Sequence, residues 1–327
     1  MIVIEPSLYL RHEPTGTAVP LLVDVSRSGR EYPPHYRTPL PFTTVHDNVS
    51  MYVEDLWAGA PAAGGTLLYC MFPNTWIDVN RNESDMDPAV VDGTWPSELR
   101  PTQRTLEGLG LIKTKSRYGE SFQERMLTVA EVEERLDRYY RPYHAELKRI
   151  ADELHSRFGV LQHISCHCMS AVGAPTHPDA GKPRADFCVS DLKGRTASPK
   201  AMTLVVETLR SYGYSVSVNE PYIGNELISR HGDPARGIDS TQVEINKKLF
   251  MDVKTFRRTE GFDNNRTHRN IRNKMAIHHI NMDQFSTSLF DFSYFIGQFR
   301  KIGCQYGGSN FNHVNTSAFD RLFLPGI

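Results

Sequence analysis

The sequence predicts an α/β protein in which helices cover both faces of a sheet, and three features indicate this class. Apolar, β-branched runs at 21–25, 66–71 and 160–166 have the length of buried strands. The segment at 48–60 has the residue spacing of a helix. The segment at 198–218 has the pattern of a helix, a turn and a strand. Such alternation is typical of a sheet with helices on both sides.

The two clearest helices carry signals at their ends. Ser198 can cap the N-terminus of the helix that follows it, and Gly213 can adopt the left-handed conformation that ends that helix. The longest helical pattern starts at Thr128, whose partner Glu131 completes a capping box. Pro142 interrupts this pattern, so we expect either a kink or two abutting helices.

Composition limits the classes of protein that fit the chain. The 327 residues suffice for one large or two ordinary domains. A hydrophobic content of 39%, with no long apolar run, argues against a membrane span. A net charge of −1 and a pI near 6.9 argue against nucleic acid or an anionic membrane as the partner. We therefore expect a soluble protein that binds a small molecule.

The N-terminus and the cysteines indicate the cytoplasm. The stretch "MIVIEPSLYL" lacks a basic flank, which fits neither a signal peptide nor a transit peptide. The five cysteines are an odd number scattered over a long chain, so reduced thiols are expected in place of a disulfide framework.

The character of the chain changes at about residue 262. Residues 1–262 are expected to form the α/β domain, and 263–327 form an atypical C-terminal tail without a sustained period. Poor order of this tail is one reading that the sequence leaves open. Its basic run at 266–274 is more typical of a solvated face than of a nucleic-acid contact. We expect the tail to contribute little to catalysis.

The stretch "LQHISCHCMSAVG" raises the question of a metal site. Along a strand, His163 and His167 lie roughly 13 Å apart, so both cannot reach one ion unless the chain bends. Cys166 and Cys168 lack the second cysteine pair that is usual in structural zinc sites. His167 ends the strand, where open α/β sheets place ligands, and is the better candidate. The alternative is a hydrogen-bonded histidine at a strand end.

Other polar residues form a candidate substrate site. Arg81 can bind a carboxylate through two parallel hydrogen bonds, and Asn80 beside it adds donors. The alternative is an arginine paired with an internal acid. Asn219 and Tyr222 lie on a loop broken by proline and glycine, and Arg27 follows the first of the buried strands.

The stretch "QVEINKKLFMD" places Gln242, Glu244 and Asn246 on one face of a strand. Three polar groups on one face of an internal strand should either be exposed at an edge or line a wet cleft. Glu244 is therefore a candidate general base, and an exposed surface glutamate is the alternative.

Seven segments, in this order, resemble the N-formylglutamate amidohydrolases: "SGREYP", "IDVNR", "YYRPYHAEL", "CHCMSAVG", "RADFCVSD", "GYSVSVNEPYIGNEL" and "QVEINKKLFMD". They extend from about residue 18 to about residue 262, and their order and spacing make the resemblance specific. The resemblance implies a zinc-dependent hydrolase with a three-layer α/β sandwich and a mixed central sheet, similar to zinc carboxypeptidases. The implied reaction removes formate from N-formyl-L-glutamate in histidine degradation.

The resemblance also implies roles for individual residues. His167 matches a zinc ligand, Glu244 matches the base or acid, and Asn80 with Arg81 matches an anchor for the substrate carboxylate. A bound metal would lower the pKa of a water, and Glu244 would take its proton.

Two departures from the family pattern affect the metal. Arg27 stands where the family usually has a histidine, and a guanidinium cannot ligate zinc because it stays protonated. Asp47 best resembles the family's acidic ligand, and His46 could replace the missing histidine. Ser165 and Cys168 stand where the family often has other residues, so the hydrogen bonds that orient the ligands can differ.

Three functions stay open from the sequence. The leading one is a zinc amidohydrolase acting on an N-formyl or other N-acyl acidic amino acid. The second is a metal-free member that binds an acidic small molecule without hydrolysis. The third is hydrolysis of a different amide, with Arg27 as a new carboxylate contact.

Overall fold

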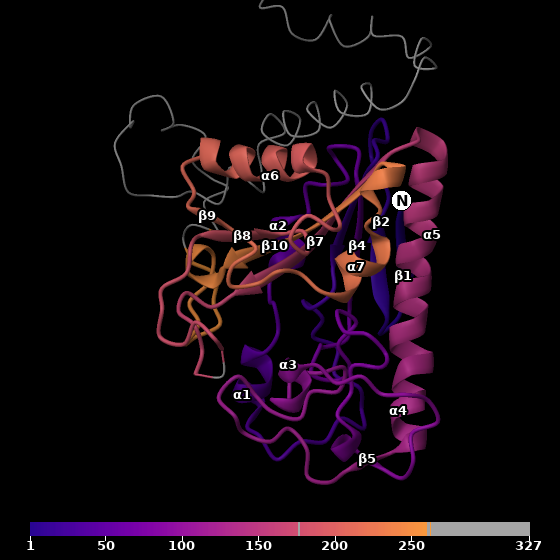
Figure 1. The fold of residues 1–327 in the computed structure, drawn as a ribbon, viewed down its shortest axis with the longest axis vertical. Coiled ribbons are helices and arrows are strands. Elements are labelled where there is room, and N and C mark those ends of the chain that lie inside the picture. Colours follow the sequence, from indigo (N-terminus) through magenta and orange to yellow (C-terminus); the bar gives the residue numbers. More distant parts are fainter. Residues whose placement is uncertain (176, 260–261, 263–327) are drawn as a thin grey trace, which may run out of the picture.

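A computed structural model describes residues 1–175, 177–259 and 262 of the chain. It confirms the predicted class, because a large mixed sheet lies between helices (Figure 1). The tail expected at 263–327 lies outside the described residues. No helix within the described ranges is long and apolar enough to cross a membrane.

The strands of the main sheet are β1 Ile2–Glu5, β2 Tyr9–His12, β3 Leu21–Val25, β4 Thr66–Cys70, β7 Leu161–Met169, β8 Phe187–Ser190, β9 Val216–Val218 and β10 Ile238–Asn246. A small second sheet pairs β5 Val91–Asp92 with β6 Leu127–Thr128. The α-helices are α1 Phe42–Asp47, α2 Val53–Leu56, α3 Gln103–Leu106, α4 Val129–Arg135, α5 Arg141–Phe158, α6 Pro199–Ser211 and α7 Glu226–His231. Short 3-10 helices span Pro88–Val90, Pro234–Arg236 and Lys247–Leu249, and a π-helical turn spans Leu136–Tyr140.

The main sheet has eight strands in the order β1-β2-β4-β3-β7-β10-β8-β9. Its centre is parallel, since β4, β3, β7 and β10 all run the same way. The strands β2 and β8 flank this centre and run antiparallel to it. The carboxyl ends of four central strands therefore meet at one edge of the sheet.

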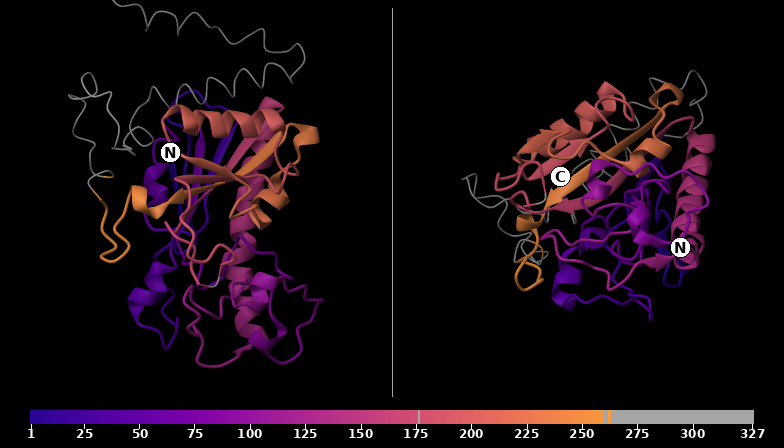
Figure 2. Two further views of the ribbon diagram at one scale, coloured as in Figure 1. Left: turned by 60° about the vertical axis from the view of Figure 1, so that its left-hand side comes forward. Right: turned by 60° about the horizontal axis from the view of Figure 1, so that its bottom comes forward.

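Two hydrophobic cores cover the two faces of the sheet, as the layers in Figures 1 and 2 show. Val23 on β3 packs into the core that includes α6 and α2. Its neighbour Leu22 points to the opposite face and packs with α5. The strand is buried on both faces, which explains why its sequence is apolar except for Asp24 and does not alternate. These layers form the expected three-layer sandwich.

The longest helical pattern folds as α4, a π-helical turn and α5 in succession. The capping box at its start is present, with the Thr128 side chain and the Glu131 side chain each bonding the other residue's backbone. Pro142 lies in the first turn of α5, where the missing N–H costs least. The π turn absorbs the interruption that the proline predicts.

The helix expected at 48–60 is much shorter than the sequence pattern indicates. Only Val53–Leu56 is α-helical, because Tyr52 has a positive φ of 68° that no continuous helix can contain. The Tyr52 hydroxyl donates to the carbonyl of Phe256 at 2.7 Å, which helps to hold this conformation. Tertiary contact therefore overrides a local helical pattern at this point.

Candidate functional site

Residues that are distant in the sequence meet at the carboxyl edge of the parallel strands. Arg27 follows β3, Asn80 lies on the loop after β4, and His167 and Glu244 occupy neighbouring positions on β7 and β10. Open α/β sheets bind ligands at this edge, because helices cover the faces and only loops enclose the strand ends.

A cavity of about 290 Å³ opens at this edge. Its lining includes Glu244 together with five cationic side chains. These are Arg27, Arg81, Arg104, Lys113 and Arg117. One carboxylate faces five cations among the lining residues, so the cavity is suited to a ligand with negative charge. We call it the cationic pocket.

The floor of the cationic pocket is a buried ion pair. Arg27 donates from Nε to Oδ1 of Asp78 at 3.1 Å and from Nη2 to Oδ2 at 2.6 Å. Asp78 is fully buried, and Lys113 Nζ lies 3.9 Å from the same carboxylate. Burial opposes ionisation of Asp78, yet the charges of Arg27 and Lys113 lower its pKa below the usual value. Two parallel bonds to a buried carboxylate fix the Arg27 guanidinium in one orientation.

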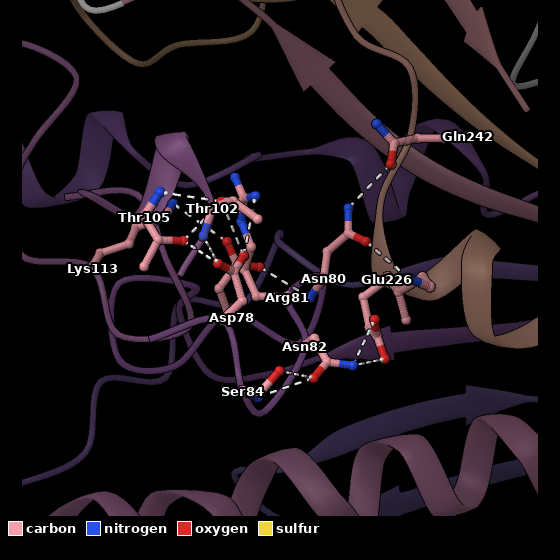
Figure 3. Close-up of polar contacts among 12 residues, drawn as sticks. Asp78, Asn80, Arg81, Asn82, Ser84, Thr102, Thr105, Lys113, Glu226 and Gln242 are labelled. Atoms are coloured by element: carbon pink, nitrogen blue, oxygen red, sulfur yellow. Dashed lines mark hydrogen bonds and ion pairs between the residues drawn. The ribbon is translucent and has the colours of Figure 1, made fainter. Parts of the chain in front are cut away.

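Asn80 joins three segments around the pocket, as Figure 3 shows for its contact with Gln242. Its amide nitrogen donates to Oε1 of Gln242 at 3.1 Å and lies 3.4 Å from Nε2 of His167. Its oxygen accepts from the backbone N–H of Leu227 at 3.1 Å. A side chain with this many partners is held rigidly, so the loop after β4 has a defined position over the strand ends.

Arg81 lies beside Asn80 and lacks a strong partner. Its closest described carboxylate is Asp85, at 3.7 Å from Nη1, and its buried Nε has no hydrogen-bond partner among the described residues. Figure 3 shows the Asp85-binding residues Thr102 and Thr105 next to it. Much of the hydrogen-bonding capacity of Asp85 is therefore already used, which leaves the Arg81 guanidinium available to an anionic ligand.

Glu244 is the carboxylate of the pocket lining. It lies on β10 and accepts a hydrogen bond from Nε2 of Gln242 at 3.0 Å. Burial raises its pKa to about 7, against the opposing charges of Arg27 and Arg184. A carboxylate with a pKa near neutrality can both accept and return a proton, which is the property that a general base needs.

Lys113 and His177 complete the electrostatics of the pocket. Burial lowers the pKa of Lys113 to about 7 even though Asp78 lies nearby. Burial, followed by the charges of Arg104 and Arg184, lowers the pKa of His177 to about 4. At neutral pH His177 is therefore uncharged and accepts a hydrogen bond at one ring nitrogen only, although its Nε2 and Nδ1 lie 3.1 Å from Arg104 and 2.9 Å from Arg184.

The structure brings most of the predicted substrate-binding residues together. Arg27, Asn80, Arg81 and Tyr222 all line the cationic pocket. Asn219 does not line the pocket. Its amide nitrogen donates to Asp191 at 2.8 Å, and its oxygen accepts from the backbone N–H groups of Asp191 and Lys193 on the loop after β8. Because Asn219 holds a turn, with a φ of 54°, its prediction as a substrate contact does not agree with the geometry.

The residues predicted to bind zinc do not form one cluster. His167 is buried against Ser165 and Asn80, with 3.1 and 3.4 Å contacts at Nε2. Asp47 accepts from Arg117 and Tyr118, both at 3.2 Å. His46 contacts Tyr32 and stacks on Phe42.

Across 1–175, 177–259 and 262, no group of three His, Cys, Asp or Glu side chains is arranged to hold a metal ion. The donors present therefore do not fit the zinc that the resemblance implies, and Arg27 fills its part of the site with a fixed positive charge. The first histidine of the stretch at 161–169 is also accounted for. His163 is buried between Asp24 and Ser240, at 2.7 Å from each.

Several pocket residues were not found from the sequence. Asp78 lies within the "IDVNR" stretch but carries no signal of its own, because its role depends on Arg27, which is 51 positions earlier. Arg104 lies on the short helix α3, and Lys113 and Arg117 lie in the irregular segment between α3 and β6. The density of basic residues in that non-periodic segment is the signal that could have indicated them.

Comparison with known proteins gives the family of the chain. The family model described as N-formylglutamate amidohydrolase matches residues 19–251. An N-formylglutamate deformylase of Pseudomonas putida is 25% identical over 205 residues, which cover 62% of this chain and 70% of that protein.

Two solved structures are also similar. The crystal structure of an N-formylglutamate amidohydrolase from Ralstonia eutropha JMP134 has a TM-score of 0.77 and 32% identity, and covers 91% of this chain and 99% of that one. A gene product of Agrobacterium tumefaciens with a TM-score of 0.54 and 14% identity covers 88% and 90% of the two chains and shows the fold alone. The match of the family model over most of the chain, together with the Ralstonia structure, shows that the chain belongs to the N-formylglutamate amidohydrolase family.

Proposed function

We propose that the cationic pocket binds an N-acyl derivative of an acidic amino acid, with N-formyl-L-glutamate as the first candidate, and hydrolyses its amide. The observation that carries the proposal is the single carboxylate, Glu244, among five cations in the pocket lining. Such a pocket offers charge complementarity to a dicarboxylate and one group able to move a proton.

The residues can be assigned to separate tasks. Arg81, supported by Asn80, binds a ligand carboxylate through its free guanidinium edge. Glu244 takes a proton from a water molecule that attacks the amide carbon, and Arg27 lies close enough to interact electrostatically with Glu244. The C–N bond then breaks as Glu244 returns the proton to the leaving nitrogen, which yields the free amino acid and the carboxylic acid.

This scheme uses no metal, because the described donors do not fit one. Arg27 instead supplies a positive charge in the pocket where the oxyanion of the tetrahedral intermediate would form. Asp78 keeps that charge in place by two hydrogen bonds before any ligand arrives.

A second candidate is binding of the same ligand without hydrolysis. The Arg27–Asp78 pair favours it, since a guanidinium that cannot ligate a metal stands where the family usually has a histidine ligand. Both candidates predict the same ligand and differ only in turnover.

Formate release from N-formyl-L-glutamate, measured together with calorimetric binding, separates the two candidates. For the hydrolase we expect turnover that Glu244→Gln lowers by about 10²- to 10⁴-fold, the usual loss for a general base. Glu54→Gln is the matched control, because Glu54 is also a buried carboxylate whose pKa burial raises to about 7, and it lies outside the pocket lining. Binding without turnover supports the second candidate. Neither binding nor turnover with any N-acyl acidic amino acid contradicts both.

A further inference from the structure

A second cavity lies apart from the strand ends. It has a volume of about 410 Å³ and is lined by the segment 35–37, by residues around the small sheet, and by α4. Trp76 and Arg135 form part of its wall. Lys113 lines both this cavity and the cationic pocket, so the two cavities are neighbours.

Arg135 is a buried cation without a carboxylate partner. Only 9% of the residue is exposed, and its Nε has no hydrogen-bond partner in the described part of the chain. Its guanidinium lies 3.6 Å from the centre of the Trp76 ring, and Nη1 donates to the Trp76 carbonyl at 2.9 Å. These contacts position the guanidinium, and the carboxylates of Glu131 and Glu134 act on its charge from beyond salt-bridge distance. Burying an unpaired charge is costly, and natural proteins usually pair such a group.

The acids nearest in sequence are already engaged elsewhere. Glu131 binds Arg125 and caps the backbone at Thr128. Glu134 binds Arg138 at 2.8 Å, and both Glu131 and Glu134 line the cavity. Among the described residues, no carboxylate lies within salt-bridge distance of Arg135, so an anion from outside the chain is the natural partner.

The walls of the cavity indicate the rest of the ligand. His35 packs edge-on against Trp76, with ring centroids 4.9 Å apart, and Tyr36 lies 5.8 Å from the same ring. Phe122 adds a further aromatic side chain to the lining. The lining also holds four basic side chains and three glutamates, namely Arg37, Lys113, Arg125, Arg135, Glu124, Glu131 and Glu134. Aromatic walls with an excess of one basic side chain are suited to a planar apolar group that carries one negative charge.

We propose that this second cavity binds a small planar carboxylate, with the carboxylate on Arg135 and the planar body against Trp76. The site does not depend on the proposed function of the cationic pocket, since Arg135 is not part of the lining of that pocket.

Calorimetric titration of the full chain with benzoate tests the site, with benzamide as the uncharged molecule of the same shape. We expect benzoate to bind at least about tenfold more tightly than benzamide, because the guanidinium fork recognises the charge. Arg135→Met should weaken benzoate binding by about tenfold or more, and Arg135→Lys should retain part of the affinity. Arg138→Met is the matched control, since Arg138 is an exposed arginine of the next turn that pairs with Glu134, and it should bind benzoate like the wild type.

Arg81→Met separates the two cavities. Benzoate affinity that persists in this variant and falls in Arg135→Met supports the proposal. Affinity that is lost in Arg81→Met and unchanged in Arg135→Met assigns benzoate to the cationic pocket and refutes the proposal, as does a wild type that binds benzoate no better than benzamide.

A measurement on the wild type does not depend on how the variants fold. The chain has three tryptophans, and their indole N–H resonances can be followed by NMR. Benzoate should shift the resonance of Trp76, which Trp76→Phe identifies. An unchanged Trp76 resonance at saturating benzoate would contradict the proposed position of the ligand.

Discussion

Replacement of Arg27 by methionine should destabilise the fold, because it leaves a buried charge at Asp78. Asp78 has 0% exposure and loses both hydrogen bonds from the guanidinium, at 3.1 and 2.6 Å. Removing one partner of a buried pair typically costs about 3–5 kcal/mol. Lys113 remains 3.9 Å from the carboxylate, so we expect the lower end of this range, about 3 kcal/mol.

A double-mutant cycle isolates the pair. Asp78→Asn keeps the shape of the side chain and should cost about 2 kcal/mol, because the Arg27 side chain is 21% exposed and can be partly solvated. In the double variant neither charge is left without its partner, so its loss should fall about 2 kcal/mol short of the sum of the single losses. The assay is urea unfolding with linear extrapolation at constant salt.

The exposed pair of Arg100 and Glu98 provides the matched control. Both side chains are 72% exposed, and their nitrogen and oxygen atoms lie 2.8 Å apart. The cycle of Arg100→Met and Glu98→Gln should give no measurable coupling energy, because solvent screens this exposed pair. If the stability losses of Arg27→Met and Asp78→Asn add up to the loss of the double variant to within about 0.5 kcal/mol, the two residues do not act as a pair. That result would refute our reasoning about the pocket floor.

Three further predictions concern pH, helix capping and metal. Burial raises the pKa of Glu244 to about 7, so Glu244 becomes ionised and the rate of hydrolysis increases as the pH rises through 7. Burial lowers the pKa of Lys113 to about 7, so Lys113 loses its positive charge and the affinity for an anion falls over the same pH range. The profile of kcat/KM against pH should therefore peak near neutral pH. Lys113→Arg should remove the fall in dicarboxylate affinity above pH 7. A fall in affinity that persists unchanged in this variant would contradict the role of Lys113. Thr128→Ala should lower the free energy of unfolding in urea by about 1 kcal/mol, because it removes one half of the capping box, and no change would show that the cap contributes nothing. Dialysis against a chelator should leave calorimetric affinity for glutarate unchanged, since side chains supply the charge of the pocket, and a large loss of affinity would show that a metal participates.

Much of the fold follows from local patterns in the sequence. The strands β3 and β4 are mostly apolar because helices cover both of their faces. The capping box at Thr128 and the cap at Ser198 depend only on residues three positions away, so they can be read without the fold. The helix expected at 48–60 failed for the opposite reason, since the positive φ of Tyr52 accompanies a contact more than 200 positions away.

The candidate site also contains residues that a local sequence pattern indicates and residues that depend on the fold. Glu244 could be found because alternation along β10 exposes a polar face in an internal strand, and that pattern is local. Asn80 and Arg81 could be found because adjacent amide and guanidinium groups suit a carboxylate. The metal ligands could not be fixed, because ligation requires several side chains at one point, and the sequence gives no distance between His46 and His167.

The structure shows which contacts Arg27 makes at the position where the family usually has a histidine. The sequence alone shows that an arginine cannot ligate zinc, but not what such an arginine does instead. In the structure it is bound by a fully buried aspartate, so the change from a neutral ligand to a cation is accompanied by a compensating anion directly beneath it. Asp78, Asp85, Glu107 and Asp47 pair with Arg27, Arg81, Arg104 and Arg117 but lie outside the lining, so an excess of positive charge faces the cavity even with Glu244 ionised. A ligand with two carboxylates balances that excess and a neutral amide does not, so discrimination between acidic and neutral amides should depend on salt and should weaken as ionic strength rises.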